Sequence, residues 1–346
     1  MAGKQDWMIW ARDPWQWYEA TPQGFRIVNG RFTYNRVLHG AHGPMKVLGG
    51  DRPQIRMAET PDWRYGDLSF YVQHGTLGKW CHEFQHIEAF YDAGGMRWNL
   101  TDPAFPGLQL HLEVWPMPDA PGLVARLWAS EAAEVFWLLG NLGYAQRSIL
   151  GQGPTSREGW FRDAGVSPQT VDSCKLTLED GYVIAGRHPQ CPKTTRAATW
   201  PASRMVVADP NALPRVELGL SVVENERKAI LGAVKAGPEP AYLILLVNHD
   251  EDARALQELL REAPAIFNSA REHGLAIQTQ AVVDTPNMLL NQAVRGICSS
   301  LDGCWLPPSY LHGAVRWGVE CNGWFLGWRG WYGPTCLGWY DRVATA

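Results

Sequence analysis

The chain has 346 residues, 46% hydrophobic and 19% charged, so it can bury a large core and has room for two domains. Its formal net charge of −4, without a long basic run, argues against nucleic acid as the main partner. No apolar run is long enough to span a bilayer.

The first ten residues contain no apolar signal segment, so the chain as written is expected to be cytoplasmic. A processed or trimmed N-terminus would instead fit a periplasmic or secreted protein. The seven cysteines match no zinc-ligand spacing and are expected to be reduced thiols. A Gly-rich run at 151–156 is not followed by Gly-Lys-Ser/Thr, which rules out a Walker motif, and no cofactor is expected.

Residues 1–248 are dominated by short strands. Phe25 and Ile27 precede Asn29-Gly30, and Phe32 and Tyr34 follow it, which predicts a type I′ hairpin. Many short strands at close spacing predict a β-sandwich rather than βαβ units. The predicted strands are 45–48, 54–57, 68–72, 84–90, 96–100, 108–115, 123–128, 135–139, 174–178, 182–185, 205–208, 216–220 and 242–247.

Two of these runs carry a further prediction. The run 108–114 alternates apolar and polar residues, so one of its faces should meet water. The run 242–247 is apolar on both faces, which is typical of a central strand.

From residue 248 the pattern changes from strands to helices. Asp250 or Asp252 is placed to cap a first helix, which Pro264 should break or kink. A second helix is predicted to begin with Pro286 at its first position. Its predicted apolar stripe comprises Leu289, Ala293, Ile297 and Leu301.

The segment 302–341 holds six of the chain's 18 Trp, alternating with Gly, His, Arg and carboxylates. A Trp face stacks on the apolar face of a sugar, while Arg, Asp and His reach its hydroxyls. The composition therefore predicts the wall of a glycan site; the alternative is a helix–helix interface filled by these rings. The candidate substrate-binding residues are Trp305, His312, Trp317, Trp324, Trp328, Arg329, Trp331, Tyr332 and Trp339.

Two of these side chains carry alternatives of their own. His312 is placed either to contact a substrate or to pack against a neighbouring carbonyl. Arg329 can bind the carboxylate of a uronic acid through its planar guanidinium. It can equally stack on Trp328 or Trp331 and stiffen the loop.

The runs WLPPSYLHGAVRW at 305–317 and GWRGWYGPTCLGWYDR at 327–342 resemble the bacterial family known as domain of unknown function 4450. Weaker matches upstream are NGRFTYNRVLHG, GDRPQIRM, GGMRWNLTDP and GLVARLW. The family looks like six-hairpin, or (α/α)6, glycoside hydrolases. The resemblance implies a β-supersandwich domain at 1–248, a helical linker at 249–285 and the start of an α/α toroid at 286–346.

The resemblance also implies a carbohydrate-active protein, an O-glycosyl hydrolase acting on a plant or microbial glycan if the full toroid is present. Further hairpins are then expected on a longer chain. The alternative is a carbohydrate-binding or structural fragment without catalysis. The sugar, the linkage, the anomeric outcome and the oligomeric state do not follow from the sequence.

Glycoside hydrolysis needs two carboxyl groups flanking the scissile bond, one of them protonated. Glu320, between Val319 and Cys321, is a candidate for a partly buried acid. Asp341, after Trp339-Tyr340, is a candidate ligand of a sugar hydroxyl. The alternative for each is an ordinary carboxylate on a helix surface or at a cap, which is where most Asp and Glu side chains lie.

A rival hypothesis comes from the string His82-Glu83-Phe84-Gln85-His86, which has the H-E-x-x-H spacing of a zinc hydrolase. That chemistry needs a helix, which places both imidazoles on one face with the Glu beside the metal. The surroundings here are strand-like, and strand residues four apart lie about 13 Å apart.

Overall fold

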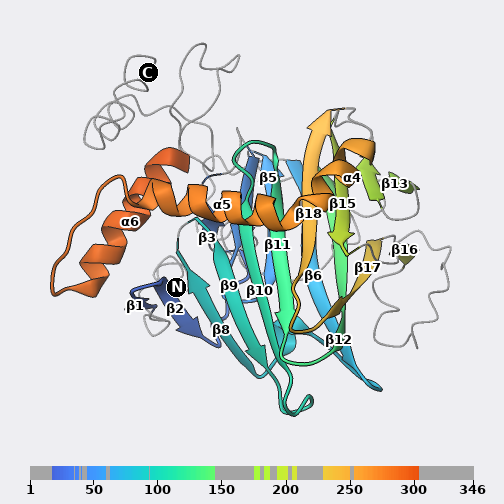
Figure 1. Cartoon of the computed structure of the whole chain (residues 1–346), viewed down its shortest axis with the longest axis horizontal. Coiled ribbons are helices and arrows are strands. Elements are labelled where there is room, and N and C mark those ends of the chain that lie inside the picture. The colour runs from blue at the N-terminus through green and yellow to red at the C-terminus, as the bar shows by residue number, and fades with distance from the viewer. Residues whose placement is uncertain are drawn as a thin grey trace, which may run out of the picture.

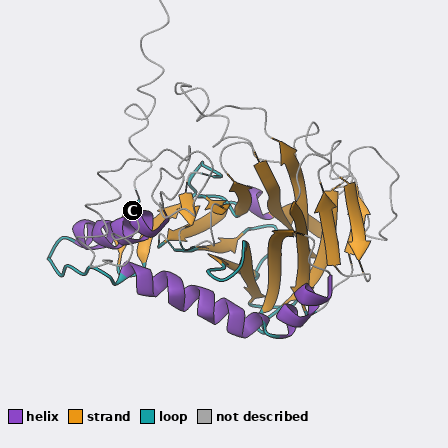
Figure 2. Cartoon of the chain, turned by 90° about the horizontal axis from the view of Figure 1, so that it is seen from above, coloured by secondary structure: helices purple, strands orange, loops and turns teal. Residues whose placement is uncertain are grey.

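A computed structural model describes residues 18–34, 36–38, 40, 45–59, 63–92, 94–144, 175–179, 183–187, 193–201, 205–208, 229–249 and 253–303. In this part of the chain, antiparallel strands form two large sheets, and three α-helices follow them (Figures 1 and 2). The predicted β-sandwich is therefore confirmed in its coarse form, as two antiparallel sheets with few helices.

The larger sheet has ten strands in the order β1-β2-β8-β9-β10-β11-β18-β15-β14-β13. Their bounds are β1 Glu19–Thr21, β2 Gly24–Val28, β8 His86–Tyr91, β9 Met96–Thr101, β10 Gln109–Pro116, β11 Gly122–Ala129, β18 Ala241–His249, β15 Lys193–Trp200, β14 Val183–Arg187 and β13 Lys175–Glu179. As its apolar sequence predicted, β18 is central, paired with β11 on one side and β15 on the other.

The second sheet has eight strands, in the order β16-β17-β12-β6-β5-β4-β3, with β7 paired to β6. Their bounds are β16 Met205–Ala208, β17 Ala229–Ala236, β12 Ala133–Tyr144, β6 Trp63–His74, β5 Gln54–Glu59, β4 Met45–Gly49, β3 Arg36–Leu38 and β7 Leu77–Trp80. Trp98 from the first sheet and Trp137 from the second are fully buried in one hydrophobic core. Alternating strand residues thus fill the space between the sheets.

The predicted hairpin at Asn29-Gly30 is wrong. The strand β2 pairs with β1 and β8, and residues 32–34 form no strand. Asn29 takes a positive φ of 53°, and its side-chain oxygen accepts a hydrogen bond from the Ile87 amide at 2.9 Å. The amide of Phe32 then donates to Asp51 at 3.0 Å. Asn29 therefore leads the chain from one sheet to the other instead of reversing it.

The helices begin where the sequence pattern changes. The strand β18 ends at His249, and α4 spans Ala253–Arg261. The helix α5, Ala263–Gln278, starts with Pro264 in its first turn, so proline separates two helices as predicted. It lies along the outer face of the larger sheet, over β10, β11 and β18 (Figure 1). The division of the chain into domains at these positions stays a prediction.

The second predicted helix is α6, Met288–Gly303, and two of its predicted details are wrong. Pro286 is not its first residue: Asn287 caps the helix by accepting the amides of Leu289 and Leu290 at 3.0 and 3.3 Å. The proposed apolar stripe faces water at Leu289, 57% exposed, and at Ile297, 54% exposed.

The buried side of α6 is instead formed by three small or polar residues, Gln292, Cys298 and Ser299. The first turn is held by Asn291, whose side chain accepts from the Thr285 hydroxyl at 2.8 Å and donates to the Thr285 carbonyl at 2.9 Å. These local hydrogen bonds set the rotation of the helix, which periodicity alone cannot predict. None of the described helices is long and apolar enough to cross a membrane.

Candidate functional site

The predicted glycan site in the Trp-rich segment lies outside the described residues. This applies to the candidate carboxylates Glu320 and Asp341 and to the whole substrate-binding set, namely Trp305, His312, Trp317, Trp324, Trp328, Arg329, Trp331, Tyr332 and Trp339. The roles given to these residues remain predictions from the sequence. The described part of the chain carries other surfaces on which a ligand can be considered.

The helix required by the zinc hypothesis is not formed. His82 lies in η2, a short 3₁₀ turn at Cys81–Glu83, whereas His86 begins strand β8. Nδ1 of His82 is buried without a hydrogen-bond partner, and burial with the nearby Arg52 charge lowers the pKa of His82 to about 4. Among the described residues, no group of three His, Cys, Asp or Glu side chains is arranged to hold a metal ion.

A ladder of polar side chains crosses the outer face of the larger sheet. The antiparallel register places Glu88, Asn99, His111 and Trp128 in one row on neighbouring strands β8, β9, β10 and β11. Asn99 donates to Glu88 at 2.8 Å and lies 2.8 Å from Nδ1 of His111. The His111 ring stacks on Trp128 with centroids 4.9 Å apart. Each member of the row is thus fixed by its cross-strand neighbour.

The electrostatics of this row follow from burial and from two arginines. Burial would raise the pKa of Glu88, but hydrogen bonds from Asn99 and Arg26 outweigh it and lower that pKa. Burial, together with the charge of Arg97, lowers the pKa of His111. The lowered pKa of Glu88 favours its ionised form, and the lowered pKa of His111 favours the neutral imidazole.

The helix α5 closes one side of this row. Glu113 accepts hydrogen bonds from the Trp115 indole at 2.9 Å and from Arg126 at 2.7 Å. The Arg126 guanidinium lies over the rings of both Trp128 and Phe267, at 4.7 and 4.4 Å from their centroids. Because Phe267 belongs to α5, these contacts attach the helix to the sheet. The predicted solvated face of β10 is therefore covered at Glu113 and Trp115.

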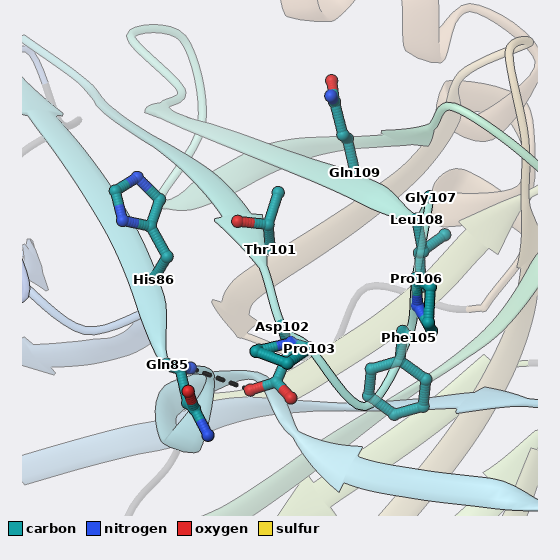
Figure 3. Close-up of a pocket in the computed structure, with 10 residues that line it drawn as sticks. All are labelled: Gln85, His86, Thr101, Asp102, Pro103, Phe105, Pro106, Gly107, Leu108 and Gln109. Atoms are coloured by element: carbon teal, nitrogen blue, oxygen red, sulfur yellow. Dashed lines mark hydrogen bonds between the residues drawn. The ribbon is translucent and has the colours of Figure 1, made fainter.

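At the other end of the same face lies a hollow of about 430 Å³ (Figure 3). Register aligns His86, Thr101 and Gln109 across β8, β9 and β10, and Figure 3 shows their side chains on the same side of the sheet. The loop between β9 and β10 forms the opposite wall. The lining residues are Gln85, His86, Thr101, Asp102, Pro103, Phe105, Pro106, Gly107, Leu108 and Gln109.

Asp102 holds this wall in place. Its carboxylate accepts hydrogen bonds from Lys79 at 2.7 Å and from the amides of Gln85 and Ala104 at 2.8 and 2.9 Å. Burial would raise the pKa of Asp102, but these donors outweigh it and hold that pKa below its usual range. Phe105, buried in the same loop, stacks on Phe84 with ring centroids 5.6 Å apart. The loop is therefore tied to the core at two points.

Sequence patterns did not predict this hollow. Its signal was present in two places: Thr101-Asp102-Pro103 ends a strand with a side chain suited to a turn, and Gln109 begins the alternating run of β10. The strand register that brings His86 beside Thr101 cannot be predicted from the local sequence.

Comparisons with known proteins agree with this architecture. No protein-family model matches the chain, and no curated protein matches its sequence. Among solved structures, a bacterial glucoamylase complexed with acarbose matches with a TM-score of 0.55 at 9% identity, over 95% of this chain and 52% of that chain. The chain thus spans about half the length of the glucoamylase, and the likeness shows the fold.

Two other structures match with lower TM-scores. A protein assigned as a kojibiose phosphorylase, from the human microbiome, gives a TM-score of 0.47 at 8% identity, over 84% of this chain and 42% of that chain. A family GH92 α-mannosidase from Bacteroides thetaiotaomicron gives a TM-score of 0.38 at 10% identity, over 82% of this chain and 38% of that chain.

Proposed function

We propose that the chain is part of a glycoside-hydrolase-like protein that hydrolyses or binds a plant or microbial glycan. The observation that carries the proposal is the match of 95% of this chain to half of a glucoamylase structure. In this proposal residues 1–248 form the β domain, 249–285 the helical linker and 286–346 the start of an α/α toroid. The resemblance of 305–317 and 327–342 to the family of unknown function 4450 supports the same assignment.

The chemistry of the proposal rests on the Trp-rich segment. Trp328 and its neighbouring rings offer faces on which sugar rings stack, and Arg329 offers a planar pair of donors. Hydrolysis further requires one protonated and one ionised carboxyl group across the scissile bond. Glu320 is proposed as a partly buried acid and Asp341 as a ligand of a sugar hydroxyl. Turnover is proposed for the protein that carries a complete toroid.

A glycan array followed by titration tests the proposal. We expect saturable binding of this chain to one class of glycan, weakened about tenfold or more by Trp328→Ala because a stacking face is lost. Trp200→Ala is the matched control, since Trp200 is a 40% exposed Trp on β15, outside the proposed site. Binding that is equal in wild type and Trp328→Ala would contradict the sugar site.

Release of reducing sugar from the bound glycan separates hydrolysis from binding alone. Measured on a protein that extends through the toroid, release would support the enzyme. Binding without release would favour the non-catalytic alternative. No binding and no release on any glycan would overturn the proposal.

A further inference from the structure

The hollow beside the β9–β10 loop displays several polar side chains. Within the described residues, no hydrogen bond is made by the side chains of Gln85, His86, Thr101 or Gln109, all of which line it. The imidazole of His86, the hydroxyl of Thr101 and the amide of Gln109 lie on one side of the sheet along a volume of about 430 Å³, whereas the Gln85 side chain extends away from them (Figure 3). This volume falls within the range of small-molecule sites, about 300–1,000 Å³.

The wall opposite these groups is apolar and built before any ligand arrives. Pro103 and Pro106 present ring carbons to the hollow, and Phe105 and Leu108 lie buried beneath them. The loop carries its own hydrogen bonds, from the Phe105 amide to Asp102 at 2.9 Å and from the Leu108 amide to Phe105 at 3.1 Å. A ligand would therefore lose little free energy in ordering this wall.

The charge of the lining limits the class of ligand. Among the described residues, the lining holds no Lys or Arg, so an anion such as phosphate or a uronate would find no ammonium or guanidinium donor there. Its one carboxylate, Asp102, already accepts three hydrogen bonds, so it does not favour a cationic ligand either. What remains is a neutral molecule with many hydroxyls on one side and C–H groups on the other.

We infer that this hollow is a binding subsite for a neutral sugar on the β part of the chain, separate from the Trp-rich segment. Thr101, Gln109 and His86 bind hydroxyl groups, and the Pro103–Pro106 wall takes the apolar face of the ring. The next row along the same face, Glu88, Asn99 and His111, lies about 7 Å away by strand rise. A longer glycan can therefore extend from the hollow along the sheet. The inference goes beyond the proposed function, because it places a sugar contact on the β part of the chain, outside the Trp-rich segment.

Titration calorimetry with neutral trisaccharides tests the subsite, using maltotriose, cellotriose and xylotriose, with glucuronic acid and inorganic phosphate as charged probes. The double variant Thr101→Val, Gln109→Leu removes a hydroxyl and an amide while keeping their approximate volumes. We expect it to weaken binding of at least one trisaccharide about tenfold. The control Gln280→Leu changes an exposed glutamine beyond α5 and should bind as wild type does. Circular dichroism verifies that each variant is folded.

Trp328→Ala distinguishes this inference from the proposed function. Binding lost in the double variant and kept in Trp328→Ala supports the hollow, whatever the outcome for the Trp-rich segment. Binding lost only in Trp328→Ala overturns the hollow and leaves the proposed function standing. The inference is also overturned if wild type binds no trisaccharide at millimolar concentration, or if it prefers phosphate or glucuronic acid in the hollow.

Discussion

The indole of Trp115 packs directly against the backbone of Gly274, where β10 passes beneath α5. A Cβ atom added to Gly274 would lie 2.5 Å from Cζ3 of that ring, which is closer than carbon atoms approach without displacement. The ring is held in place, because Trp115 is only 2% exposed and the backbones of Gly94 and Gly95 also lie close against it. A glycine in the helix therefore sets how closely α5 approaches the sheet.

Gly274→Ala should destabilise the fold by about 1–3 kcal/mol through overpacking, although alanine is the better helix former by about 1 kcal/mol. Gly296→Ala on α6 is the matched control, since nothing lies within 4 Å of its added Cβ. There the helix propensity should act alone and stabilise the protein by roughly 0.5–1 kcal/mol. Urea unfolding measures both, and effects of the same sign would contradict the assignment.

The ion pair between Arg56 and Asp67 is buried, with both side chains at most 2% exposed and two N–O distances of 2.6 Å. Asp67→Asn should cost about 3–5 kcal/mol, because it removes the buried negative charge that both guanidinium contacts reach. The control Glu19→Gln breaks a 2.8 Å pair with Arg26 at the surface, where the loss should be at most about 1 kcal/mol. Equal losses of unfolding free energy in the two variants would show that burial does not determine how much an ion pair contributes to stability here.

A pH dependence is expected from Asp92, in the turn between β8 and β9. Burial, aided by the charge of Glu113, raises its pKa from the ordinary 3.8 to about 7, although the Gly95 amide donates to it at 2.6 Å. When the pKa of a group is higher in the folded state than in the unfolded state, its protonation stabilises the fold. This stabilisation is fully present below the unfolded-state pKa and is lost as the pH rises through the folded-state pKa. Wild type should therefore lose this contribution between about pH 4 and pH 8.

Asp92→Asn stays neutral over that range and should escape the loss. The free energy of unfolding of the variant, relative to wild type, should rise by roughly 2 kcal/mol across the window, less than full burial would give because the carboxyl keeps some contact with water. Asp119→Asn, at an exposed position of the β10–β11 turn, is the control. A flat difference for Asp92→Asn in urea titrations at several pH values would rule out this pKa.

Sequence patterning predicted the strands whose alternation is simple. In β10, Leu110, Leu112 and Val114 all point into the core, as the alternating run required. The strand β15 gave no such signal. Thr194, Thr195, Arg196 and Thr199 are all buried there. Thr195, for example, donates to the carbonyl of Tyr65 at 2.8 Å, a partner 130 residues earlier in the chain. A polar strand with distant partners looks like a loop when only local periodicity is available.

The same limit applies to the candidate sites. A candidate site within one continuous segment, such as the one predicted at 302–341, can be recognised from composition because its residue types are unusual together. The hollow draws His86, Thr101 and Gln109 from three strands, each an ordinary residue in its own sequence context. Only the pairing register places them together, and register depends on contacts across the whole sheet.

The anchoring role of Asp102 can be measured amide by amide. It accepts the amides of Gln85 and Ala104, so Asp102→Ala should raise the hydrogen-exchange rates of both and cost about 1–3 kcal/mol of stability. Lys79→Met is the control, because it removes the ion-pair partner of Asp102 and leaves both amide bonds in place. If Lys79→Met speeds exchange at the two amides as much as Asp102→Ala does, the ion pair and not the carboxylate–amide bonds holds the loop. If exchange changes in neither variant, the wall of the hollow is held by the stacking of Phe105 on Phe84.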